Sequence, residues 1–209
     1  MTQTFHWSEC ARTLRRLDAE TPLSLESKRR FFVAEQLRVR PPLVFPLPAD
    51  AHSLDDYLQS LPEAPGKHCV VLMQAGHVSL GRFDKGENLI AKSLKKYVVR
   101  GKGRAQPLHL KTKGKSRYGS RLRLQNARRL LVETNEKLIE WHEEFGTPDQ
   151  IYYSCPVRLW PSLFEATPPP PFRQDDDLIK IPRDVPRPTV DVLKRTYRSL
   201  EYGRIEELD

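Results

Sequence analysis

The sequence has few cysteines and no long apolar run, and each shortage excludes a class of protein. Its three cysteines, Cys10, Cys69 and Cys155, are odd in number, widely separated and without C-x-x-C spacing. This pattern argues against a disulfide framework or zinc site and is typical of reduced cytosolic thiols. No stretch approaches the roughly 18 apolar residues that span a bilayer, and Met1 to Trp7 lack the pattern of a signal peptide. We therefore expect a cytoplasmic protein without a membrane partner.

Acidic residues are missing from one long stretch of the chain. Between Asn88 and Val132 there are fourteen Lys or Arg and no Asp or Glu, whereas the whole chain carries +8. Subtracting +14 from +8 leaves −6 for the rest, so the positive charge is concentrated here. Such a stretch indicates nucleic acid first and an acidic membrane surface second. We predict RNA contacts for all fourteen: Lys92, Lys95, Lys96, Arg100, Lys102, Arg104, Lys111, Lys113, Lys115, Arg117, Arg121, Arg123, Arg128 and Arg129.

Metal ligands are also scarce in useful arrangements. The six histidines are scattered, and no pair has ligand spacing with a third partner. We predict no metal site and no other cofactor.

Residues 1–66 are predicted to form a helical, proline-rich segment that is packed on, or appended to, the rest. Ser8–Leu17 and Ser24–Val39 have helical patterns, and prolines follow the second. Ser53-Leu-Asp-Asp56 fits a capping box, with Asp replacing Glu, for a short helix to Leu61.

Residues 67–209 are predicted to form an α/β domain with a mixed sheet flanked by helices. Apolar runs and alternation, with a hairpin turn at Asp84-Lys-Gly86, predict strands at His68–Gln74, His77–Phe83, Asn88–Ala91, Lys95–Arg100, Ile151–Cys155 and Leu178–Ile181. Apolar residues at helical spacing predict a long helix over Ser120–Phe145, with Leu124, Leu131, Leu138 and Trp141 on its core stripe. A last helix is capped by Thr189 and ends near Gly203.

A glycine-containing loop lies inside the basic stretch. It has no periodicity from Gly101 to Gly119, and Arg100-Gly-Lys-Gly-Arg-Ala-Gln106 ends in one neutral amide. Such a loop is expected to be mobile until it binds something. A glutamine does not titrate, so it cannot be a general base, but it can orient a water or donate a hydrogen bond to developing charge. His109, three residues later, is an alternative proton carrier or an exposed loop residue.

Several segments, taken in order, resemble the Vms-like release-factor domain. They are Tyr97-Val-Val-Arg-Gly-Lys-Gly-Arg-Ala-Gln106, Gly119-Ser-Arg-Leu-Arg-Leu-Gln-Asn126, Leu163-Phe164, Ile181-Pro182 and Arg187-Pro-Thr189. The family includes the ankyrin-and-zinc-finger peptidyl-tRNA hydrolase and is related to the catalytic middle domain of eukaryotic and archaeal class-one release factors. The resemblance covers about His68 to Glu206 and implies a stand-alone bacterial member, expected to be monomeric.

The resemblance implies a loop that enters the peptidyl-transferase centre, where a glutamine acts at the ester between nascent chain and tRNA. By position the glutamine is Gln106, and Gly103 matches the glycine three residues earlier. Arg104 departs from the family, which prefers a small residue there, and the run from Arg100 to Gly103 is one residue shorter.

The implied partners are the large ribosomal subunit, its RNA and peptidyl-tRNA, and the implied activity is peptidyl-tRNA hydrolysis in ribosome rescue or quality control. Two alternatives stay open: a non-catalytic binder of ribosomes or tRNA, and a tRNA 3′-end nuclease.

Overall fold

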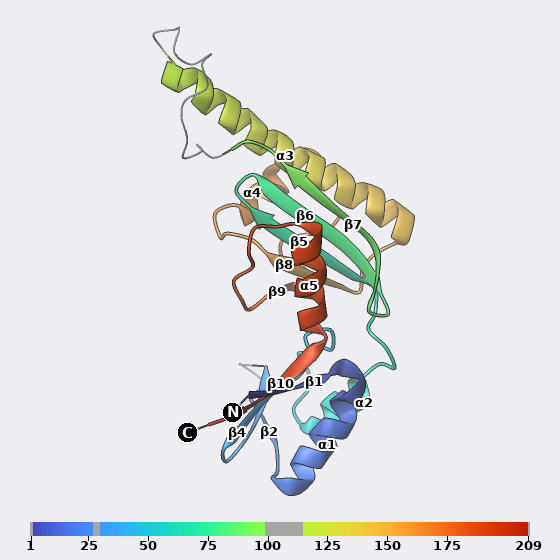
Figure 1. The fold of residues 1–209 in the computed structure, drawn as a ribbon. Helices are drawn as coiled ribbons and strands as arrows, with labels where there is room; N and C mark the ends of the chain where they lie inside the picture. Colours follow the sequence, from blue (N-terminus) through green and yellow to red (C-terminus); the bar gives the residue numbers. More distant parts are fainter. Residues whose placement is uncertain (1, 27–29, 99–114, 209) are drawn as a thin grey trace. The chain divides into compact units, whose positions relative to one another are not determined.

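A computed structural model gives the structure of residues 2–26, 30–98 and 115–208, with side chains from 119 onward in the last range. The chain divides into two compact units. The first comprises Met1–Gly66, Asp84–Glu87 and Arg195–Asp209, and the second comprises Lys67–Phe83 and Asn88–Lys194. Each unit contains one five-stranded sheet (Figure 1).

The first unit is built on an antiparallel sheet that joins the two ends of the chain. Its strand order is β1 (Thr2–His6), β10 (Tyr202–Glu207), β4 (Leu37–Arg40), β3 (Phe31–Ala34) and β2 (Ser24–Glu26). The 3-10 turn η1 (Trp7–Glu9) leads into helix α1 (Cys10–Glu20), which buries Leu14 and Leu17. Gly203 of β10 passes so close to Phe5 of β1 that a Cβ would lie 2.3 Å from the ring. Only glycine fits this approach.

The helix predicted over Ser24–Val39 was wrong, because its described residues lie in the strands β2, β3 and β4. Phe31, Phe32 and Val33 favour strands, and Leu37 and Val39 alternate with arginines at the period of a strand. The decisive partner comes from far along the chain, since Val39 pairs with Ile205 of β10. By contrast, the predicted capping box is confirmed: Ser53 and Asp56 bond reciprocally at the start of α2 (Leu54–Ser60).

The second unit has a mixed sheet, as predicted, in the order β7 (Glu87–Lys95), β6 (His77–Asp84), β5 (His68–Gln74), β8 (Gln150–Ser154) and β9 (Leu178–Lys180). β5 pairs antiparallel with β6 but parallel with β8, which is parallel with β9. The hairpin turn between β6 and β7 has positive φ at Lys85 and Gly86, which is the geometry of a type I′ turn.

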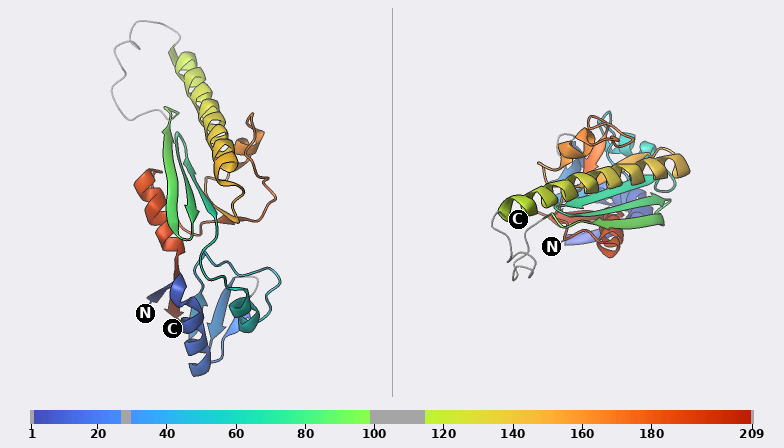
Figure 2. Two further views of the ribbon diagram at one scale, coloured as in Figure 1. Left: turned by 90° about the vertical axis from the view of Figure 1, so that its right-hand side faces the viewer. Right: turned by 90° about the horizontal axis from the view of Figure 1, so that it is seen from above.

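Helices cover both faces of this sheet (Figure 2). On one face, α3 (Lys115–Phe145) and α4 (Trp160–Glu165) bury Leu138, Trp141 and Leu163 against β5 and β6. On the other face, α5 (Val190–Leu200) begins with a bond from Val192 N–H to the Oγ1 of Thr189, the predicted cap. Leu193 then packs on Gly81, where a Cβ would lie 2.5 Å from its side chain.

The buried stripe of α3 differs from the prediction at one end. Leu130, Leu131, Leu138 and Trp141 are buried, but Leu124 is 55% exposed. Figure 1 shows the first turns of α3 extending past the edge of the sheet, and the exposure of Leu124 shows that the buried stripe does not continue along the whole helix.

Within the described ranges, no helix combines the length and the apolar character that crossing a bilayer requires.

Candidate nucleic-acid interface

The candidate interface lies at one edge of the mixed sheet. Because β5, β8 and β9 run parallel, their carboxyl ends share this edge, and β7 ends there too. In open α/β sheets, ligands bind outside the carboxyl ends of the strands. Here β7 ends at Lys95, three residues follow it, and α3 begins at Lys115 after the segment 99–114.

Two lysines of β7 are exposed at this edge, on different faces of the sheet. Lys92 has the strand parity of Ile90 and Leu94, which pack into the core beneath α3. Lys95 has the opposite parity and therefore points to the other face. Lys96 differs from both, because its Nζ lies 2.7 Å from Glu133 Oε1 of α3. Its charge therefore has a partner within the protein.

Four arginines whose side chains the structure describes lie on the first half of α3, which extends beyond the sheet. Arg121 and Arg128, seven residues apart, share one face of the helix, and Arg129 is exposed beside them. Arg123 is partly buried and donates to Ser120 Oγ at 3.1 Å. We call Lys92, Lys95, Arg121, Arg123, Arg128 and Arg129 the basic surface. It is spread over both β7 and α3, so it suits a partner that wraps around this end of the unit.

Apolar side chains are exposed among these cations. Tyr97 is 56% exposed and Leu124 55%, with Leu122 also on the surface. Arginines beside exposed apolar and aromatic groups suit a nucleic acid, because its phosphates bind arginines and its base faces stack on apolar and aromatic side chains.

Residues 96–98, which we call the stem, are tied to the body of the unit. Lys96 N–H donates to Gly76 O at 2.9 Å, and Asn126 Nδ2 of α3 donates to Tyr97 O, also at 2.9 Å. Gly76, in the turn between β5 and β6, has φ +79°, and a Cβ there would lie 2.6 Å from Lys96 O. Glycine is therefore required at the turn for the stem to pass.

The remaining predicted residues lie outside the described part of the chain. They are Gln106, Gly103, Arg100, Lys102, Arg104, Lys111 and Lys113, together with the side chains of Lys115 and Arg117.

Sequence reasoning missed the contacts made by Asn126, Glu133 and Gly76, because each joins segments far apart in the chain. It also missed Arg187, which donates through Nε to His77 Nε2 at 2.8 Å, at the start of β6. Asn126 and Arg187 both belong to the segments that carry the family resemblance, and that was the available signal.

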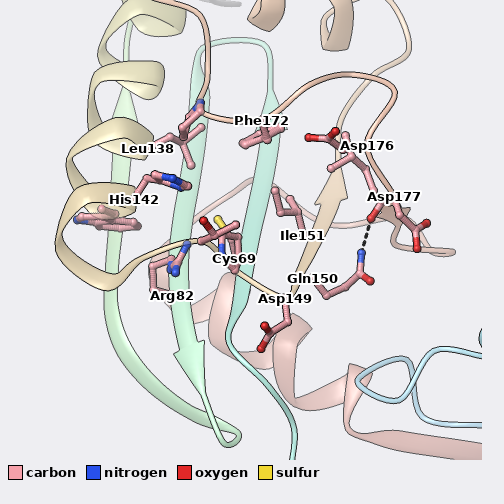
Figure 3. A pocket seen from close by; sticks show the side chains of 15 residues that line it. Cys69, Arg82, Leu138, His142, Asp149, Gln150, Ile151, Phe172, Asp176 and Asp177 are labelled. Carbon is pink, nitrogen blue, oxygen red and sulfur yellow. Dashed lines mark hydrogen bonds between the residues drawn. The ribbon is translucent and has the colours of Figure 1, made fainter. Parts of the chain in front are cut away.

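A pocket of about 230 Å³ lies at the other edge of the sheet, beside the C-terminal end of α3 (Figure 3). Leu138, Trp141 and Phe172 are among its apolar walls, and Asp176 and Asp177 lie at its side. The buried Arg82 donates to Gly146 O at 2.7 Å, next to the last turn of α3. A cation stabilises the negative end of a helix, so Arg82 has a structural role there. The aspartates disfavour phosphate, and we place no nucleic-acid site at this pocket.

The cysteines are buried and unsuited to nucleophilic chemistry. Burial raises the pKa of the Cys69 thiol to about 11, although Arg82 nearby lowers it, and burial raises the pKa of Cys155 to about 12. Both remain protonated near neutral pH and act as core residues. In the described ranges, no group of three His, Cys, Asp or Glu is arranged to hold a metal ion.

A family model described as "Bacteroidetes VLRF1 release factor" matches residues 68–208. The chain belongs to this family, which confirms the resemblance drawn from the sequence. The family is one of release factors, which places the protein in translation at the ribosome.

Among solved structures, the chain is similar to the "Vms1 mitochondrial localization core", with a TM-score of 0.55 and 15% identity over 95% of this chain and 82% of that one. This likeness confirms the predicted α/β fold. No curated protein matches the sequence.

Proposed function

We propose that the protein releases nascent chains from peptidyl-tRNA on the large ribosomal subunit by hydrolysing the peptidyl ester. Membership of a release-factor family carries this proposal. The basic surface supports it, because its exposed lysines and arginines lie on the two elements that flank the segment 99–114. Phosphates of ribosomal RNA would supply most of the affinity through counterion release.

Gln106 is the proposed catalytic residue, with Gly103 allowing the backbone to approach the substrate. The side-chain amide would orient the attacking water or donate a hydrogen bond to the oxygen of the tetrahedral intermediate. Water then adds to the ester carbonyl carbon and the bond to the tRNA oxygen breaks. The products are a peptide carboxylate and an intact tRNA 3′ end, with the proton from water passed through groups of the ribosomal RNA.

The alternatives would leave different products. A nuclease would cut the tRNA and leave nucleotides on the peptide, and a binding protein would leave peptide and tRNA joined. No Asp or Glu lies between Asn88 and Val132, so this stretch offers no carboxylate for an independent nuclease. The observation favours ester hydrolysis over a nuclease, and the products distinguish it from a binding protein.

The test is the chemical identity of the tRNA 3′ end after incubation with stalled large subunits. We expect full-length tRNA with a free 3′ hydroxyl and a peptide that ends in a carboxylate. A shortened tRNA would show that the protein is a nuclease and not a hydrolase. Unchanged peptidyl-tRNA at saturating protein would leave only the binding function.

A further inference from the structure

The charge of the second unit is distributed differently in the sequence and in the fold. Residues 133–194 contain seven Lys or Arg and twelve Asp or Glu, so their net charge is 7 − 12 = −5. By sequence, this part of the chain therefore attracts no phosphate. The fold, however, separates the charges that follow its strands from those that precede them.

Basic residues follow the carboxyl ends of two parallel strands. Lys180 is the last residue of β9, Arg158 lies between β8 and α4, and Arg183 and Arg187 lie between β9 and α5. All four are exposed, and Asp184 is the one acidic residue in these two connections. We call Arg158, Lys180, Arg183 and Arg187 the carboxyl-edge cations.

Acidic residues precede the same strands. Asp149 comes directly before β8, and Asp175, Asp176 and Asp177 come directly before β9. Figure 3 shows three of these four aspartates around the pocket at this edge. The two ends of neighbouring parallel strands therefore carry opposite charge, which attracts a polyanion to the carboxyl edge and disfavours it at the other.

Arg187 is held in place while its charge remains uncompensated. Its Nε donates to His77 Nε2 at 2.8 Å. Because this ring nitrogen accepts a hydrogen bond, His77 is neutral and does not repel the guanidinium. Gln74 Nε2 donates to Val185 O at 2.8 Å and fixes the same connection to the end of β5. Arg187 is therefore pre-positioned at the carboxyl edge.

The turn between β5 and β6 joins these cations to the basic surface. His77 bonds to Arg187, and the neighbouring Gly76 O accepts from the N–H of Lys96, directly after Lys95. β7 and β9 are the outermost strands of the sheet, four strand spacings or about 19 Å apart. The two groups of cations therefore form one band along the whole edge.

We propose that the carboxyl-edge cations bind phosphates of ribosomal RNA and continue the basic surface across the second unit. This inference rests on the proposed function, because the large subunit supplies the RNA. A band about 19 Å long suits a polymer, since a single phosphate reaches only part of it. The binding surface thus includes cations from outside the stretch between Asn88 and Val132.

The test compares two double variants that change the net charge equally. Arg158→Gln with Lys180→Gln removes two carboxyl-edge cations, and Lys67→Gln with Arg173→Gln removes two exposed cations that precede β5 and β9. Among the described residues, none of these four side chains has a hydrogen bond or an ion pair, so both variants should fold like the wild type. Co-sedimentation with large subunits at several salt concentrations measures the Kd and its salt dependence.

The slope of log K against log salt is negative, and for Arg158→Gln with Lys180→Gln we expect its magnitude to decrease by about two units. Affinity at low salt should fall on the order of 10- to 10²-fold. The Lys67→Gln and Arg173→Gln control should keep both values. Arg187→Gln should lower the magnitude by about one unit, and Arg187→Lys, which keeps the charge, should lower it less.

An unchanged slope in the carboxyl-edge variant, or equal changes in both double variants, would overturn this inference and leave the proposed function intact. A wild type that does not bind large subunits would remove both. A wild type that binds but releases no peptide would remove the hydrolysis alone. If the carboxyl-edge variant lost binding to anionic lipid vesicles but not to large subunits, the edge would be a membrane surface and the inference would be wrong.

Discussion

At the scale of single residues, Gln106 carries the chemistry of the proposed reaction. A glutamine can contribute only through position and hydrogen bonding, because its amide neither gains nor loses a proton near neutral pH. We expect Gln106→Ala to lower the maximal rate of peptide release by about 10²- to 10³-fold, the range seen when one oxyanion donor is removed. Binding to the large subunit should stay nearly unchanged, because the phosphate contacts are made elsewhere.

The matched control for Gln106→Ala is Gln125→Ala, which removes an exposed glutamine from α3. Both variants are measured for release and for co-sedimentation with large subunits. Equal release by Gln106→Ala and the wild type would exclude Gln106 from the mechanism. A variant deficient in both binding and release would make Gln106 a binding residue instead.

Other residues show where local sequence is a poor guide. Leu124 fits the apolar period of α3 and was therefore expected in the core, but it is exposed. The period alone does not reveal where a helix leaves the core. Gly203 was interpreted as the end of the last helix, yet it lies in β10 opposite Phe5, where a side chain would clash. In both cases the deciding neighbour is distant in the sequence.

At the scale of elements, α3 joins the core of the second unit to the candidate interface. Its second half buries Leu138 and Trp141, and its first half, which carries the four arginines of the basic surface, extends past the sheet. The buried apolar stripe of the second half holds the whole helix in place, so the charged first half needs no core of its own.

We expect replacement of Arg121, Arg128 and Arg129 by Gln to weaken binding to the large subunit. The slope of log K against log salt is negative, and its magnitude should decrease by about one unit for every arginine–phosphate contact that the variant can no longer make. Sedimentation at several salt concentrations measures this slope.

The control replaces Arg12, Arg15 and Arg16 of α1, which are also exposed, by Gln. Both triple variants change the net charge equally, so a general charge effect would alter them alike. An unchanged slope in the α3 variant would mean that this half of α3 is not at the interface.

Elements built from local patterns were predicted well. β5 has the predicted bounds, β6 and β8 differ by a residue at their ends, and α3 begins five residues earlier than expected, at Lys115 in place of Ser120. The hairpin turn and the Ser53–Asp56 box depend on neighbours in sequence, so they were visible too. β4 and β10 were missed because their pairing joins residues 37–40 to the last strand of the chain. β2 and β3 pair with their neighbours in sequence, and they were missed because the apolar residues of 24–39 were assigned to a helix. The stem contacts were hidden because, like the pairing of β4 with β10, they join distant segments.

At the scale of the whole molecule, charge is separated along the chain. The stretch from Asn88 to Val132 carries a charge of +14, whereas the whole chain carries +8. The rest of the chain therefore carries −6. A uniformly basic protein would stick to any polyanion, whereas this distribution directs one region to nucleic acid. The rest of the chain has a net negative formal charge, which on average disfavours binding to phosphate outside the basic stretch.

The same reasoning predicts what the protein requires of its substrate. The segment 99–114 contains Gln106, a single histidine, His109, and no carboxylate, so most groups that handle protons and charge in the proposed reaction must come from ribosomal RNA. Free peptidyl-tRNA lacks those groups and does not hold the ester in a fixed orientation. We therefore expect kcat/KM for free peptidyl-tRNA to be at least about 10²-fold below that for the same tRNA on a large subunit, since fixed geometry alone is worth that much. Release from both substrates, measured with the wild type and with Gln106→Ala at one salt concentration, checks this expectation. If free peptidyl-tRNA were hydrolysed as fast, the protein would hold a complete catalytic site of its own, and the search for that site would move to the rest of the chain.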